Sequence, residues 1–212
     1  NKNTDLVYLS YSSPKTQSKT FLYNLKTKEK KLVKEQEIPS GHNSQDYIVE
    51  RHECSSNDGR MIPITITRHK KTKIDGSAKL LLYGYGSYGN SMSPGFSSTR
   101  LSLINRDVIW VTAHIRGGLE RGMKWWKEGK LLNKKNTFND YIAVGKYLID
   151  KKYTSKGKII GMGGSAGGLL MGAVLNKAPE LFLGIIMAVP FVDSLTTNLD
   201  HSLPLTVGEF DE

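Results

Sequence analysis

Residues 163–168 read Gly-Gly-Ser-Ala-Gly-Gly, and this run constrains the fold more than any other part of the 212-residue chain. A serine between glycines at a strand-to-helix junction allows a sharp turn, in which the serine backbone is strained and the hydroxyl is exposed. Side chains at the flanking positions would crowd the neighbouring strand or helix, so small residues are a steric requirement. We therefore predict that Ser165 lies at a nucleophile elbow.

The sequence around this run supports the same interpretation. Residues 158–162 form a short, mostly apolar segment that is typical of a buried strand. After Ser165, apolar side chains recur at helical spacing, and Pro179 follows the expected end of that helix. A phosphate-binding loop would need Gly-x-Gly-x-x-Gly or a Gly-Lys-Ser/Thr ending, and residues 163–168 contain neither. The context favours an elbow over another kind of glycine-rich turn.

The second half of the chain alternates between two kinds of segment. Longer, helix-capable stretches separate four apolar runs at residues 80–83, 108–113, 159–162 and 184–189. This alternation is typical of a mostly parallel sheet with helices on both faces. The clearest helix is expected near residues 137–149, where Thr137 to Asp140 resembles a capping box. The predicted fold class is α/β, in a domain at residues 41–212.

The first forty residues have a different pattern. Strand-like runs at 6–11, 20–25 and 31–33 predict a β-meander, which is too small to bury a core of its own. We expect it either to pack on the following domain or to belong to a larger all-β unit. Beyond a short linker at 38–41, two strand-like runs flank an Asn-Asp-Gly turn and predict an antiparallel hairpin.

Composition excludes several classes of function. The net charge is +10, but the lysines are spread along the chain without an aromatic-interleaved basic stripe, so no nucleic-acid partner is expected. The longest apolar stretch, at 181–192, contains Pro190 and is too short to cross a membrane. Cys54 is the only cysteine, which permits a cytoplasmic location. Five histidines without ligand spacing predict neither a metal site nor a cofactor.

An elbow serine needs an oxyanion site nearby. Its donors usually come from the N–H of the next residue, here Ala166, and from the loop after an earlier strand. Residues 83–89 read Tyr-Gly-Tyr-Gly-Ser-Tyr-Gly and follow the run at 80–83. The glycines permit close backbone approach and the tyrosines offer hydroxyl donors, although a flexible aromatic loop is equally compatible with the residues alone.

Several further segments occur in an order that resembles a known family. These are residues 81–89, Arg-Gly-Gly at 116–118, residues 135–141, the elbow, and Val-Pro-Phe-Val-Asp at 189–193. Together they resemble the oligopeptidase B branch of the prolyl oligopeptidase family of serine peptidases, across residues 47–212. The resemblance implies a partial α/β-hydrolase fold, preceded at residues 1–40 by the end of a β-propeller. It also implies hydrolysis of short peptides after Arg or Lys.

The resemblance also implies roles for individual residues around the elbow. Ser165 would be the acylating nucleophile. Tyr85 would donate its hydroxyl to the oxyanion beside the N–H of Ala166. Tyr88 would line the pocket for the residue before the scissile bond.

Two carboxylates near the end of the sequence complete the implied site. Glu209 and Asp211 match the acidic pair that the resemblance links to a preference for arginine and lysine, and Asp211 stands where a glutamate is usual. Residues i and i+2 of an extended segment point to one side, so two carboxylates can hold a guanidinium. From the residues alone, an acidic, frayed chain end is the alternative.

The residues that would activate Ser165 are expected elsewhere. In α/β-hydrolases the triad runs serine, acid, histidine, so the resemblance implies that the aspartate and histidine follow Glu212. Core or surface roles are expected for the five histidines present, which are His42, His52, His69, His114 and His201. We expect the chain to be inactive alone, with an unpaired sheet edge, unless a second chain supplies the rest. A non-catalytic remnant and another α/β-hydrolase, such as an esterase, remain alternatives.

Overall fold

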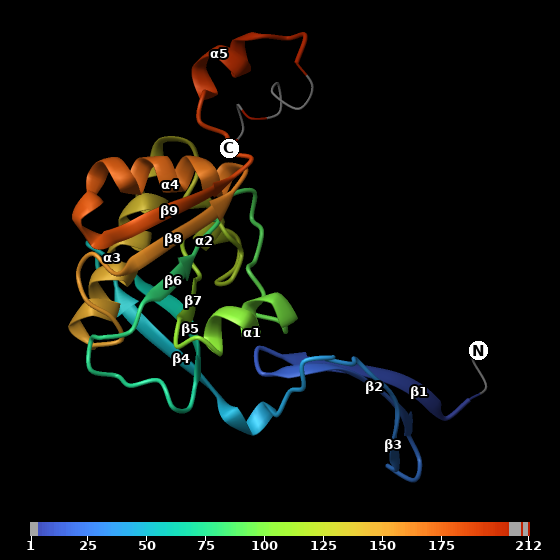
Figure 1. Cartoon of the computed structure of the whole chain (residues 1–212). Coiled ribbons are helices and arrows are strands. Elements are labelled where there is room, and N and C mark those ends of the chain that lie inside the picture. Colours follow the sequence, from blue (N-terminus) through green and yellow to red (C-terminus); the bar gives the residue numbers. More distant parts are fainter. Residues whose placement is uncertain (1–3, 204–208, 210–211) are drawn as a thin grey trace.

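The computed structural model describes residues 4–203, 209 and 212, which form two separate sheets (Figure 1). The smaller sheet is antiparallel and contains β1 (Leu6–Ser13), β2 (Thr16–Asn24) and β3 (Lys30–Glu35). All side chains of these strands are exposed or half-buried, so the predicted meander without its own core is confirmed. Its origin in a β-propeller stays a prediction.

The larger sheet has six strands in the order β4-β5-β7-β6-β8-β9. Their bounds are β4 (Tyr47–Ser55), β5 (Met61–His69), β6 (Leu80–Tyr83), β7 (Ile109–Ala113), β8 (Ile159–Gly164) and β9 (Phe182–Ala188). The predicted hairpin of β4 and β5 is present, and β5 is also antiparallel to β7. The four strands from β7 to β9 are mutually parallel, as expected for an α/β protein.

Helices connect these strands. The α-helices are α1 (Ser98–Ile104), α2 (Met123–Lys127), α3 (Lys135–Asp150), α4 (Ala166–Lys177) and α5 (Ser194–Leu199). Short 3-10 helices are η1 (Ser44–Asp46), η2 (Leu131–Asn133) and η3 (Pro179–Leu181). Within the described part of the chain, no helix combines the length and apolarity that a membrane span requires.

The helices cover both faces of the six-stranded sheet, as predicted. Ile109 and Val111 of β7 point into a buried core that is completed by apolar side chains of α3 and α4. Successive side chains of a strand point to opposite faces, so Trp110 lies on the other face. There it packs with Leu101 and Ile104 of α1. This two-sided cover explains why β6 and β7, which are mostly buried, read as continuous apolar runs.

The carboxyl ends of β6 and β8 lie side by side, which places the elbow and the aromatic loop at one edge of the sheet. Tyr83 pairs with Met162 in parallel register, and the chain then leaves β6 into residues 84–89 and β8 into α4. On β9, the outermost strand of the described sheet, Leu183, Ile186 and Met187 are exposed.

The expected capping box of α3 is wrong. The helix begins at Lys135, so Thr137 and Asp140 lie inside it and are both fully buried. The Thr137 hydroxyl donates to the carbonyl oxygens of Arg116 and Gly129, at 2.9 and 3.1 Å. Contacts with another segment therefore determine the roles of these side chains, and local capping does not.

Candidate active site

Ser165 occupies the sharp turn between β8 and α4 that the sequence predicts. Its backbone has φ 54° and ψ −120°, a conformation that costs free energy for a residue with a Cβ, and the residue is exposed. Its N–H donates to the Ala188 carbonyl at 2.9 Å. Its own carbonyl accepts from the N–H groups of Gly168 and Phe191, at 2.8 and 3.0 Å. Main-chain hydrogen bonds on both sides thus hold the strained residue in place.

Two glycines of the elbow are required by close packing. A Cβ on Gly163 would lie 2.3 Å from the Gly167 carbonyl oxygen, and one on Gly168 would lie 2.5 Å from Pro190. Both distances are shorter than any real carbon contact, and the obstructing atoms include backbone that cannot move freely. The steric requirement inferred from the sequence is therefore met by specific neighbours.

The loop after β6 lies directly against the elbow. The Gly84 N–H donates to the Met162 carbonyl of β8 at 3.1 Å, and Tyr85 follows beside Gly167. Ala166 is 5% exposed and begins α4, so its N–H is one of the free donors of the first helical turn. The structure therefore places Tyr85 and Ala166, the two residues expected to supply the oxyanion donors, beside the elbow.

A cavity of about 200 Å³ adjoins this turn. Its wall includes Ala166 of the elbow and Tyr88 of the aromatic loop. The other lining residues come from the aromatic loop, from η2 and the residue before α3, from α4, from the segment after β9 with α5, and from the end of the sequence: Ser87, Leu131, Lys134, Leu169, Phe191, Ser194, Asn198, Glu209 and Glu212. A side chain placed in this cavity would leave its neighbouring peptide group close to the elbow.

The acidic wall of the cavity differs in detail from the expectation. Glu209 accepts a hydrogen bond from the Tyr88 hydroxyl at 2.5 Å. Burial, together with the charge and hydrogen bond of Glu209, raises the pKa of Tyr88, which keeps this hydroxyl protonated. Asp211 lies outside the described residues. Glu212 supplies the second described carboxylate, and its N–H donates to the Glu209 carbonyl at 3.1 Å.

Two functional candidates in this cavity were not found from the sequence, Lys134 and Glu212. Glu212 accepts from the Tyr88 N–H at 2.5 Å and from the Trp126 indole N–H at 3.1 Å. The Lys134 ammonium donates to the Gly86 carbonyl at 3.0 Å and to the Ser87 hydroxyl. Glu212 lies three residues after Glu209 in the same acidic segment, which was the signal available for it. Nothing in the sequence distinguished Lys134 from the many other lysines.

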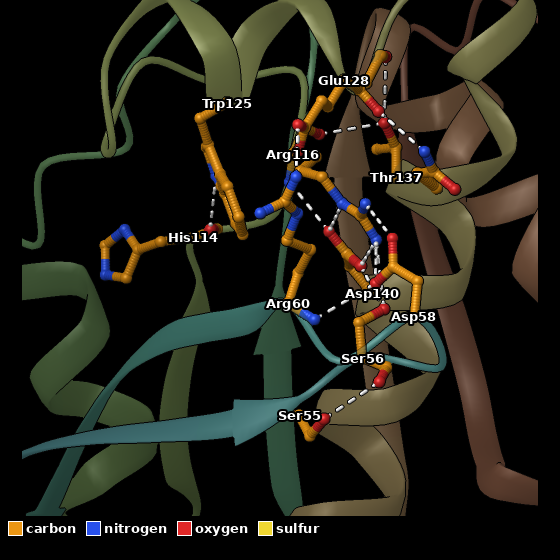
Figure 2. A network of polar contacts seen from close by, with 12 residues as sticks. Ser55, Ser56, Asp58, Arg60, His114, Arg116, Trp125, Glu128, Thr137 and Asp140 are labelled. Carbon is orange, nitrogen blue, oxygen red and sulfur yellow. Dashed lines mark hydrogen bonds and ion pairs between the residues drawn. The ribbon is translucent and has the colours of Figure 1, made fainter.

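Arg116 lies at the centre of a network of polar contacts that includes a buried ion pair (Figure 2). The Arg116 guanidinium binds both carboxylate oxygens of Asp140, at 2.6 and 2.8 Å, and also reaches Asp58 and Ser56. The side chains of Arg116 and Asp140 are 2% and 0% exposed. Gly117 follows with φ +96°, and a Cβ there would lie 1.9 Å from the Gly86 carbonyl oxygen. The network therefore fixes the surface on which the loop rests.

Three of the five histidines, His114, His52 and His42, have partners away from the elbow, in agreement with the expected core and surface roles. His114 is 1% exposed, and its Nε2 lies 2.8 Å from the Thr65 hydroxyl. His52 contacts Tyr147, and His42 contacts the Lys15 carbonyl. Among the residues that the structure describes, no group of three or more His, Cys, Asp or Glu side chains could hold a metal ion.

Comparisons with known proteins find relatives that match nearly the whole chain. The chain is 48% identical to dipeptidyl aminopeptidase BI of Pseudoxanthomonas mexicana and 44% identical to protease 2 of Moraxella lacunata, over 99% of its own length in both cases. It spans 29% and 30% of the length of these two relatives.

Solved structures give the same picture. Oligopeptidase B from Trypanosoma brucei, in a closed form with covalently bound antipain, superposes with a TM-score of 0.92 at 40% identity. Oligopeptidase B from Leishmania major gives 0.91 at 41% identity. Both matches cover 99% of this chain. They cover 30% of the Trypanosoma brucei chain and 29% of the Leishmania major chain. The resemblance to the oligopeptidase B branch is thereby confirmed.

A family profile connects the fold, the elbow and these relatives. The profile described as the prolyl oligopeptidase family matches residues 94–212, which contain β7, β8, β9 and the elbow between β8 and α4. This is more than half of the chain. The chain belongs to the prolyl oligopeptidase family.

Proposed function

We propose that this chain carries the nucleophile and the specificity pocket of a serine peptidase that hydrolyses short peptides after Arg or Lys. One observation carries the proposal: the exposed, strained Ser165 adjoins a cavity whose wall contains Ala166 and the Glu209 carboxylate. The names of the relatives, a dipeptidyl aminopeptidase, a protease and oligopeptidase B, support peptide substrates.

The proposed reaction is acyl transfer through Ser165. The serine oxygen attacks the carbonyl carbon of the scissile bond while its proton passes to a general base. Negative charge then develops on the carbonyl oxygen, where the Ala166 N–H and the Tyr85 hydroxyl donate hydrogen bonds. The carbon–nitrogen bond breaks, the leaving amine takes the proton, and water later hydrolyses the acyl-enzyme ester.

The size and charge of the cavity favour a substrate with a basic residue before the scissile bond. A cavity of about 200 Å³ accommodates one long side chain, and Tyr88 forms part of its wall. Glu209 provides a carboxylate for a guanidinium or ammonium group. We keep Asp211 as the proposed second carboxylate, as the family resemblance implies.

The general base is proposed to come from outside these 212 residues, in a second chain or otherwise. The contacts of His114, His52 and His42 with other partners support this proposal. Residues 41–212 would then be part of a peptidase domain and residues 1–40 the end of a propeller. No nucleic-acid or membrane partner is proposed, and the cytoplasmic location stays a prediction.

The test is the selectivity of peptide cleavage by the intact protein, which here means the 212 residues together with the part that supplies the proposed general base. Fluorogenic peptide amides with Arg, Lys or norleucine before the scissile bond should show preference for the two basic residues. Glu209→Gln should lower kcat/KM for Arg and Lys roughly ten- to hundredfold, because a charge-assisted hydrogen bond is lost, and leave norleucine nearly unchanged. Glu180→Gln, on the exposed η3 segment, is the matched control and should change neither.

The alternatives predict other results. Turnover of esters without cleavage of Arg or Lys amides would favour an esterase. Absence of turnover with every substrate, in the intact protein, would favour a non-catalytic remnant. An equal loss for basic and neutral substrates in Glu209→Gln would contradict the assigned pocket.

A further inference from the structure

Lys134 is an unusual lysine because its charged end lies inside the cavity wall. Its side chain is 18% exposed, and its ammonium donates to the Gly86 carbonyl at 3.0 Å and to the Ser87 hydroxyl. These two residues follow Tyr85 directly in the chain. Burying an ammonium is costly unless its donors are paired, so these contacts are specific rather than incidental.

Glu212 completes the attachment of the same loop. Its carboxylate lies 3.8 Å from the Lys134 ammonium and accepts from the Tyr88 N–H at 2.5 Å. Its main-chain carbonyl accepts from the Leu131 N–H at 2.6 Å, which ties this end of the sequence to the segment before α3. Lys134 and Glu212 therefore hold three successive residues, 86, 87 and 88, immediately after Tyr85.

The charges in the cavity separate two tasks. Of the two described carboxylates, Glu212 is already engaged by an ammonium, an indole N–H and a main-chain N–H. Glu209 has the Tyr88 hydroxyl as its described side-chain partner. Within the described part of the chain, Glu212 forms an ion pair with Lys134, whereas Glu209 has no cationic side chain within 4 Å. A substrate cation entering the cavity would thus find the more available carboxylate at Glu209.

The loop has little other freedom once Lys134 is in place. Gly84 is fixed to β8 through the Met162 carbonyl, and Gly86 has φ +71°. A Cβ on Gly86 would lie 2.4 Å from Thr137, so the backbone is in close contact there. Removing the donor from the Gly86 carbonyl would release the peptide group between Gly86 and Ser87, one residue beyond Tyr85. Small displacements of an oxyanion donor weaken its interaction strongly.

We infer that Lys134 is a positioning residue for the oxyanion donor Tyr85, with Glu212 as its counter-ion, and that it takes no part in binding the substrate cation. This inference rests on the proposed function, since it assigns Lys134 to the acyl-transfer step of that reaction. In this assignment, Glu209 binds the substrate cation, and Lys134 holds the loop that follows Tyr85.

Two probes distinguish these two roles in the intact protein. The first probe is antipain, which is bound covalently in the Trypanosoma brucei structure. As a reagent, antipain is a peptide aldehyde that ends in argininal. The Ser165 O–H would add across the aldehyde C=O, forming one carbon–oxygen bond without a leaving group and placing the former carbonyl oxygen at the oxyanion site. Benzamidine carries the cation alone and requires no oxyanion donor. Binding of both is measured by competition or calorimetry.

Lys134→Met should weaken antipain binding roughly tenfold or more and leave benzamidine within about threefold of wild type. Lys135→Met is the matched control, since Lys135 is the adjacent, exposed lysine at the start of α3, and it should change neither probe. Ser87→Ala removes one acceptor of the Lys134 ammonium and keeps the charge. It should give a smaller selective loss for antipain, and it provides the test if Lys134→Met does not fold.

The inference is overturned if antipain and benzamidine lose affinity by the same factor, or if antipain binding is unchanged in both variants. If wild type binds neither probe, the proposed function fails and the inference fails with it. If wild type binds both probes but the variants do not affect antipain selectively, the proposed function stands and only the role of Lys134 is overturned.

Discussion

Ser165 and Tyr88 both have a positive φ, 54° and 57°, at the same edge of the sheet, yet different interactions hold them there. Ser165 is held by main-chain hydrogen bonds with Ala188 and Phe191 and by glycines that exclude side-chain volume. Tyr88 is held by carboxylates, with Glu212 at its N–H and Glu209 at its hydroxyl. The elbow therefore depends on backbone shape, and the loop depends on charged side chains from distant segments.

The largest effect is expected from the buried ion pair that supports the loop side. Asp140→Ala leaves the Arg116 guanidinium buried without its main partner, so we expect a loss of about 3–5 kcal/mol in the free energy of unfolding. Asp58→Ala removes a partner that is 46% exposed, and should cost less than about 1 kcal/mol. Denaturant unfolding of the two variants measures both. Equal losses would contradict the claim that burial of the pair determines its importance.

The elbow side should respond to added volume instead. Gly168→Ala places a methyl group 2.5 Å from Pro190, and overpacking of this kind costs about 1–3 kcal/mol. Gly172→Ala, one turn further along α4, meets no atom within 4 Å and should stabilise the protein by about 0.5–1 kcal/mol through helix propensity. Thermal unfolding compares the two. An unchanged melting temperature in Gly168→Ala would contradict the claim that the elbow depends on backbone shape, because the elbow would then tolerate side-chain volume.

A smaller effect should appear in the pH dependence of stability, and only on the loop side. Burial lowers the pKa of the Lys134 ammonium, although Glu212 and Glu209 oppose the shift. The unfolded chain then binds this proton more tightly, so this group makes stability rise with pH between its folded pKa and the ordinary lysine value of 10.5.

We therefore expect wild type to gain stability relative to Lys134→Met as the pH rises toward about 10.5. Wild type should show no such gain relative to the Lys135→Met control. Denaturant unfolding at a series of pH values measures the difference. A wild type that loses stability relative to Lys134→Met over this interval would show that the ammonium is stabilised, rather than penalised, in the folded protein.

The same contrast explains what the sequence could predict. The elbow, its flanking strand and helix, and the parallel sheet were predictable, because each depends on local steric requirements or on the periodicity of apolar residues. The expected capping box at Thr137 was wrong, because a tertiary contact with Arg116 takes the side chains that local capping would use. At Ser165 the local sequence pattern predicts the role that the residue has in the fold. At the start of α3 it does not.

The loop side was harder to predict because its contacts join residues that are far apart in the chain. Lys134 and Glu212 meet only after α3 and the end of the sequence reach the same cavity. Nothing in the composition distinguishes Lys134 from its exposed neighbour Lys135. Tyr85 and Tyr88, by contrast, were found through the family resemblance, which preserves the order of motifs even where individual contacts cannot be inferred.

If Ser165 is the nucleophile of a peptidase site, a reagent that modifies activated serines should label it covalently. A fluorophosphonate is incubated with the 212-residue chain, with the chain plus a polypeptide supplying an aspartate and a histidine, and with the intact protein. Mass spectrometry of the digested protein then locates the adduct, and Ser165→Ala is the control. The account predicts one adduct, on Ser165, wherever the base is supplied, and none in Ser165→Ala. Absence of an adduct on Ser165 under every condition, or equal labelling of Ser165→Ala, would contradict it.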